Sequence, residues 1–182
     1  MTRGGTWINR TGLLVAVLAA GLLAGCAATP SDSVIIADAR ASVVRFVDRD
    51  PGLQEWVNHA HGYVVFPSVG KGGLGVGGSY GRGVVFERGE PVGKTSITQA
   101  TIGAQIGVQS FAQIIFFQDE AALRTFQRGN FEFSAQATAV AATAGKAATT
   151  SYEKGVAAFI MTKGGLMAEA TIGAQKFDYE RL

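Results

Sequence analysis

Two hydrophobic patterns divide the chain near Gly62. Over residues 34–50 the apolar positions recur with the spacing of an α-helix, and the charged positions fall mainly on other faces. The positions that this pattern predicts to face inward are Ile36, Val43, Val44 and Val47. Pro51 and Gly52 end the predicted helix, and residues 53–59 are predicted to add a short helical turn.

After Gly62 the pattern is typical of β-strands. Residues 63–66 form a β-branched and aromatic run, which Pro67 is expected to end. Residues 70–83 hold eight glycines in fourteen positions, interleaved with apolar side chains. This predicts a tightly curved strand pair, because glycine permits bulges and close backbone approach. The apolar and alternating runs that predict further strands are 84–86, 95–109 and 111–117.

The last third of the chain adds one helix and more strands. Asp119 is placed to cap a short helix over 120–127. Its inward positions are Ala122, Leu123 and Phe126. Over 131–141 the alanines favour helix, but the period-two alternation favours a strand, and we predict a strand. Further strands are predicted over 155–161 and 166–179.

Together these elements predict an α+β fold. We expect a predominantly antiparallel, strongly curved, Gly-rich β-sheet of barrel-like form, with an N-terminal amphipathic helix and one short helix. Two short sequences also occur twice: residues 71–74 recur at 163–166, and residues 100–105 recur letter for letter at 170–175. We expect similar hairpins in related places of one sheet, with chance recurrence of abundant glycine and alanine as the alternative.

The N-terminal segment has the pattern of an export signal. Arg3 and Arg10 accompany an apolar run over 13–24 that is too short to cross a hydrocarbon core of about 30 Å. Leu23-Ala24-Gly25-Cys26 resembles the bacterial lipobox, a signal in which the cysteine thiol receives a diacylglycerol and the new amino group is usually acylated too. Cys26 is the only cysteine in the chain. An ordinary signal peptide with a chance cysteine is the alternative.

These features predict three segments: a lipoprotein signal peptide over 1–25, a lipidated tether over 26–33 and a folded domain over 34–182. Ala27, rather than an aspartate that would retain the protein in the inner membrane, follows the cysteine. We therefore expect a lipid-anchored protein of the outer membrane, facing the periplasm. Removing the signal lowers the formal net charge from +2 to zero, so overall charge gives no support for nucleic-acid binding.

No constellation of catalytic or metal-binding residues stands out. His59 and His61 have no third ligand at a suggestive spacing. Residues 70–75 match G-x-G-x-x-G. Dinucleotide binding requires a helix to begin directly after this motif, and the sequence predicts none there. No serine lies in a G-x-S-x-G motif, which would mark a nucleophile. Residues 95–118 contain no charged side chain, so this apolar stretch offers no carboxylate whose pKa burial could tune for catalysis. We predict a protein that is not an enzyme and that uses no metal or cofactor.

Several glycine- and aromatic-rich motifs follow one another between residues 60 and 180. They are Gly62-Tyr63-Val64-Val65-Phe66-Pro67-Ser68-Val69, Lys71-Gly72-Gly73, Gly77-Gly78-Ser79-Tyr80-Gly81-Arg82-Gly83, Gly103-Ala104-Gln105-Ile106-Gly107, Lys163-Gly164-Gly165-Leu166 and Ile172-Gly173-Ala174-Gln175. In this order they resemble the SYLF, or Ysc84-type, domain family, and the export signal resembles that of its bacterial branch. The resemblance implies a compact, β-rich, lipid-binding module. Residues 91–96 replace the family's tryptophan- and proline-bearing stretch, so the actin binding and phosphoinositide specificity of eukaryotic relatives are not carried over.

Two functions fit these observations. The first is a membrane-anchored lipoprotein whose domain binds anionic phospholipid through basic side chains. The candidates in the Gly-rich part are Lys71, Arg82, Arg88 and Lys94, and those on the predicted helix are Arg40, Arg45 and Arg49. A solvated strand edge and a helix packed on the sheet are the respective alternatives. The second function is a structural or interaction protein of the envelope, with an unknown protein partner and no lipid site beyond its own acyl anchor.

Overall fold

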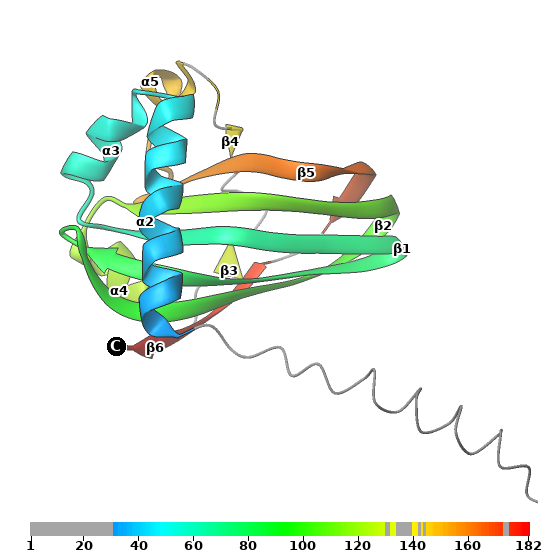
Figure 1. The fold of residues 1–182 in the computed structure, drawn as a ribbon, viewed down its shortest axis with the longest axis horizontal. Helices are drawn as coiled ribbons and strands as arrows, with labels where there is room; N and C mark the ends of the chain where they lie inside the picture. The colour runs from blue at the N-terminus through cyan, green and yellow to red at the C-terminus, as the bar shows by residue number, and fades with distance from the viewer. Residues whose placement is uncertain (1–30, 130–131, 134–139, 142, 144, 173–174) are drawn as a thin grey trace, which may run out of the picture. The chain divides into compact units, whose positions relative to one another are not determined.

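The structure is a computed structural model that describes residues 31–129, 132–133, 140–141, 143, 145–172 and 175–182. Within these residues the chain forms helices and strands in mixed order (Figure 1). The elements are α2 (Asp32–Arg49), α3 (Leu53–His59), β1 (Gly62–Glu87), β2 (Glu90–Phe117), α4 (Glu120–Gln127), β3 (Glu132–Phe133), β4 (Val140–Ala141), α5 (Lys146–Thr149), β5 (Val156–Ile172) and β6 (Gln175–Arg181).

One sheet contains all of these strands, and β2 is its central strand. One edge of β2 pairs with β1 along the whole length of the hairpin, and the other edge pairs with β6 over 93–99 and with β5 over 102–117. The order across the sheet is β3-β6-β2-β5-β4, and only β4 and β5 run parallel. The prediction of a predominantly antiparallel sheet with a few helices is confirmed. The strand order is open rather than closed, so the barrel-like form is not confirmed.

The β1–β2 hairpin is long and folds back on itself (Figure 1). The register between its strands shifts near Gly75, whose φ is +73°. Beyond this bend the second half of β1 returns close to the first half. A Cβ on Gly81 would lie 2.8 Å from the carbonyl oxygen of Ser68, and one on Gly83 would lie 2.6 Å from that of Val65. Glycine at these positions therefore allows an approach that any larger residue would block.

Pro67 does not end the first strand, contrary to the prediction. β1 continues through it, because the register shifts between Phe66 and Val69. A bulge at this place leaves the proline, which has no N–H, outside the regular ladder. The strands predicted at 63–66, 70–83 and 84–86 are thus one strand, β1, and those predicted at 95–109 and 111–117 are one strand, β2. The strand predicted over 131–141 lies largely outside the described residues.

The sheet buries side chains on both faces. Tyr63 and Val65 pack in one hydrophobic cluster with side chains of α2 and α3, whereas Val64 and Phe66 pack in a second cluster with side chains of α4. This alternation follows from the two-residue period of a strand. The predicted helix over 120–127 is confirmed, and the Asp119 carboxylate accepts a hydrogen bond from the backbone N–H of Ala122 at 2.8 Å.

Helix α2 packs its buried side against the sheet. The buried residues of this helix are Ile35, Ala39, Ser42 and Phe46. Ile36, Val43 and Val47 are partly buried against the same cluster, but Val44 is 59% exposed, contrary to the prediction. Val44 precedes the fully buried Phe46 by two residues, which places it roughly 200° away around the helix.

The end of α2 is tied to a distant segment by a buried carboxylate. Asp50 is 1% exposed, and its Oδ2 accepts a hydrogen bond from the backbone N–H of Ala147 at 2.7 Å. Its Oδ1 accepts from the backbone N–H groups of Gly52 and Gly145, each at 3.2 Å. The two bonds from Gly145 and Ala147 fix the start of α5, a helix that was not predicted from the sequence.

The two repeated sequences lie in neighbouring strands of one sheet. The copy at 100–105 belongs to β2, and the copy at 170–175 spans the end of β5 and the start of β6. These copies run antiparallel to each other, with Ile102 opposite Ile172. The two Lys-Gly-Gly-Leu copies flank β2, one on each of its edges.

Candidate functional site

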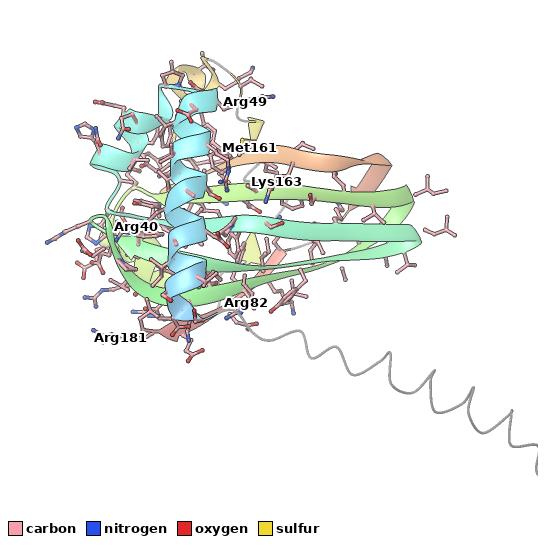
Figure 2. The ribbon with its side chains drawn as sticks, in the orientation of Figure 1. Arg40, Arg49, Arg82, Met161, Lys163 and Arg181 are labelled. Carbon is pink, nitrogen blue, oxygen red and sulfur yellow. The ribbon has the colours of Figure 1, made fainter. Side chains whose placement is uncertain are left out.

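The structure brings two of the seven candidate cations together at one hollow. Arg82 lies on β1 opposite Ser96 of β2, and Lys94 lies on β2 opposite Val84. Both side chains line a hollow of about 340 Å³. Its other lining residues are Thr95, Ser96, Asp178, Tyr179 and Glu180. Figure 2 shows Arg82 near the lower edge of the sheet.

The Arg82 guanidinium is the distinctive group of this hollow. Its Nη1 is buried and has no hydrogen-bond partner among the described residues. Arginine cannot lose its charge in a protein, and a buried N–H group without an acceptor is destabilising. An oxyanion in the hollow would supply that acceptor once a small side-chain movement exposed Nη1, and it would match the planar donor geometry of the guanidinium.

Lys94, in contrast, already has carboxylate partners. Its Nζ lies 3.1 Å from Oδ1 of Asp32 on α2 and 3.7 Å from Oε1 of Glu180 on β6. On the same wall the Ser96 hydroxyl donates to Oδ2 of Asp178 at 3.1 Å. Lys94 therefore holds the N-terminal turn of α2 against the sheet, and Arg82 is the cation better placed to meet a ligand.

A second hollow of about 360 Å³ shares Tyr179 with the first. Its remaining lining residues are Glu87, Val92, Glu120, Leu123, Arg124, Gln127, Arg128 and Arg181. Burial raises the pKa of Tyr179, the nearby Arg181 lowers it and Glu87 raises it, and the net direction is upward. The phenol therefore stays neutral near pH 7 and donates to the carbonyl oxygen of Val92 at 3.4 Å.

The three arginines of this second hollow were not predicted from the sequence as site residues. Arg181 reaches it only because β6 pairs with residues 93–99 of β2, a contact between distant parts of the chain. Arg124 and Arg128 lie four residues apart at the end of α4, and this helical spacing was the available signal. Arg124 forms an ion pair with Glu120, which reduces the net positive charge of the hollow.

The other two cations of the Gly-rich part lie elsewhere. Lys71 is on β1 opposite Gln109, close to the bend of the hairpin. Arg88 is exposed in the turn between β1 and β2, and its backbone N–H donates to the carbonyl oxygen of His61 at 3.3 Å. Lys71 lies near the bend and Arg88 at the opposite end of the returning half of β1, so cations that are close in sequence do not form one patch.

The arginines of α2 are arranged as expected for a helix packed on the sheet, which was one of the two alternatives. Arg40 places its guanidinium carbon 5.7 Å from the centre of the Phe86 ring. Arg45 donates from Nη2 to the Ser42 hydroxyl at 2.5 Å. Arg49 is exposed in the last turn of the helix (Figure 2).

The remaining candidates add little chemistry. The imidazole of His59 lies near Glu55, whereas that of His61 lies 3.2 Å from Glu87, so the two histidines have separate partners. Within the described ranges no three potential metal ligands lie together, and no helix there is both long and apolar enough to cross a membrane. Cys26 lies outside the described residues.

Comparison with known proteins defines the class. The model of the Ysc84 family, described as Las17-binding protein actin regulator, matches residues 98–179. The predicted resemblance to the SYLF, or Ysc84-type, family is confirmed over these residues. The matched segment includes most of β2, helix α4, strand β5 and most of β6. That family is one of lipid binding and actin regulation rather than of enzymes.

One curated relative is a bacterial protein. The chain is 28% identical over 142 residues to beta cell expansion factor A of Aeromonas veronii, an alignment that covers 76% of this chain and 53% of that protein. The chain therefore matches only about half the length of this relative.

Proposed function

We propose that the chain is a lipid-anchored envelope lipoprotein whose Ysc84-type domain binds anionic phospholipid at the Arg82 hollow. One observation carries the proposal: Arg82 lines an open hollow with a buried Nη1 that lacks an acceptor within the described residues. Family membership supports a domain of the lipid-binding type. A phosphodiester offers anionic oxygens for charge-assisted hydrogen bonds, which are stronger than those between neutral groups.

Replacing Arg82 by glutamine should weaken binding to anionic vesicles by roughly 5- to 30-fold, because one charge-assisted contact contributes about 1–2 kcal/mol. Residues 31–182 form one compact unit, so this segment without the acylated cysteine is a suitable sample. Flotation with vesicles of phosphatidylglycerol and phosphatidylcholine measures the binding. Raising the salt from 0.1 M to 1 M should weaken wild-type binding, since the Debye length falls from about 10 Å to about 3 Å.

Arg88→Gln is the matched control. It removes the same charge from the exposed turn and should leave binding unchanged. Equal binding by wild type and Arg82→Gln at low salt would place the lipid site elsewhere, first of all on the arginines of the second hollow. No binding by either protein would favour the alternative function, an envelope interaction protein.

The anchor has a separate test. We expect the mature membrane form to begin at Cys26 and to carry acyl chains on that residue, as the lipobox resemblance implies. Cys26→Ser should leave the protein uncleaved or soluble. Mass spectrometry of the membrane fraction reports the modification, and an unmodified Cys26 in that fraction would refute it. Recovery in the inner rather than the outer membrane would refute the expected location.

A further inference from the structure

The bend of the β1–β2 hairpin exposes a group of aliphatic side chains. We call this group the apolar tip, and its members are Leu74, Val76, Ile102, Ile106 and Val108. Each of the five side chains is between 61% and 75% exposed. Figure 1 places the bend away from the helices, and Figure 2 shows side chains projecting outward there. Adjacent exposed aliphatic residues of this kind mark a contact surface more often than scattered single ones.

The tip consists of strand residues on both sides of the register shift at Gly75 rather than of a loop. Leu74 lies opposite Ile106, and Val76 lies opposite Ile102, so their side chains meet in cross-strand pairs. The other edge of β2 is paired as well, with Ile102 opposite Ile172. Ile102, Ile106 and Val108 of β2 thus have strand partners on both edges, and pairing of that kind lowers the penalty for entering hydrocarbon.

With increasing distance from the tip, the side chains change from apolar to aromatic and then to cationic, as the layers of a bilayer change from acyl chains to headgroups. Tyr80, 57% exposed, follows Val76 by four residues, and Lys71 precedes Leu74 by three, a span of roughly 10 Å along a strand. Arg82 and its hollow come next. Interfacial proteins present their groups to a membrane in this order: apolar side chains contact the lipid tails, amphipathic aromatic rings lie at the interface, and cations meet the headgroups.

Charge favours the same partner. Residues 68–86 of β1 and 91–117 of β2 contain no aspartate or glutamate, and their only charges are Lys71, Arg82 and Lys94. In β5, which borders the same part of β2, Lys163 and Glu169 contribute one charge of each sign. The part of the hairpin around the tip therefore carries no carboxylate of β1 or β2 that would repel an anionic surface, and Glu87 and Glu90 lie at its far end.

The composition of the tip is less suited to a protein partner. Protein interfaces concentrate their binding energy in tryptophan, tyrosine and arginine seated in pockets, and leucine and valine are under-represented among such residues. The five members of the tip are leucine, isoleucine and valine, and they are flanked by glycine. A fluid layer of acyl chains accepts such a surface without requiring a complementary shape.

From these observations we propose that the apolar tip inserts into the outer part of a phospholipid bilayer, where it orients the domain so that Lys71 and the Arg82 hollow meet the headgroups. This inference deepens the proposed lipid binding and rests on it. It assigns the apolar contact to the bend of the hairpin and excludes α2 from that role, because α2 is packed on the sheet.

A depth measurement tests the insertion. The full chain is purified from membranes and reconstituted into vesicles whose lipids carry a nitroxide quencher on the acyl chain. Val76→Cys provides a thiol for an environment-sensitive dye, and Val44→Cys on α2 is the matched control, since these valines are 67% and 59% exposed. The parent chain, whose Cys26 is expected to be blocked by acylation, should take up no dye.

We expect the lipid quencher to remove most of the emission at position 76 and little at position 44. Changing Leu74 and Ile106 to serine together should then protect the dye at 76, and both side chains are exposed enough for the fold to persist. Equal, weak quenching at both positions would overturn the inference. The inference would also be overturned if, in the absence of vesicles, the dye emission at position 76 varied with protein concentration. That result would show that the tip contacts a second copy of the chain.

The two proposals can fail independently. If Arg82→Gln weakens binding to anionic vesicles but the dye at 76 remains unquenched, the headgroup site stands and tip insertion is refuted. If the dye at 76 is quenched while Arg82→Gln binds like wild type, insertion stands and the Arg82 site is refuted.

Discussion

Replacing Gly81 by valine should lower the free energy of unfolding by about 3 kcal/mol, and by more if the backbone cannot shift. A Cβ there would lie 2.8 Å from the carbonyl oxygen of Ser68 and 3.1 Å from the Cα of Val69. Both contacts are with backbone atoms of the facing half of β1, which cannot rotate away as a side chain can. For a domain of this length the melting temperature should fall by roughly 6–12 °C.

Gly70→Val is the control for this prediction. A Cβ at Gly70 meets nothing within 4 Å, and the residue lies on the same strand before the bend. Its substitution should change the melting temperature by only a few degrees at most. A Gly81→Val protein as stable as the Gly70→Val protein would show that the two halves of β1 do not approach as closely as the structure indicates.

The second large effect is expected at Phe46. Its ring is fully buried in the cluster that joins α2 to β1, so Phe46→Ala should cost about 3–5 kcal/mol of stability. Val44→Ala, on the exposed side of the same helix, should cost at most about 0.5 kcal/mol. Denaturant unfolding of both variants measures the difference. Equal, small effects would mean that α2 is not part of the core.

Local pattern sufficed for much of the fold. The spacing of apolar residues located α2, α3 and α4 to within two residues, because each of these helices buries side chains against the sheet. Asp119 was recognisable as a cap because its bond to Ala122 is made within one helical turn. The elements that were not predicted depend on contacts between distant residues. Val44 was misplaced because the core-facing side of α2 is centred on Phe46, and α5 was missed because Asp50 supports it from almost a hundred residues away.

Prediction of the candidate site was likewise limited to contacts between residues that are close in sequence. Arg82 and Lys94 could be selected from sequence because they lie near each other on adjoining strands of one hairpin. The glycine pattern predicted strong curvature but not the position of the bend, and Lys71 lies close to that bend whereas Arg88 lies in the turn after β1. Arg181 was invisible as a site residue because it depends on the pairing of β6 with β2. The apolar tip was not located from sequence, since the charge-free run over 95–118 does not reveal which of its residues lie at a bend, and Leu74 and Val76 lie outside that run.

The repeated segment at 100–105 and 170–175 also has a consequence for folding in a crowded environment. Within one molecule these copies pair antiparallel, with Ala104 opposite Ala170 and Ile102 opposite Ile172. A sequence that pairs antiparallel with its own repeat can pair in the same register with an identical segment of another molecule. Two chains that meet before β5 has docked can therefore exchange this strand, which is the basis of domain swapping and of edge-to-edge aggregation. Closure of β5 onto β2 within one molecule occupies the edge that such an exchange would need.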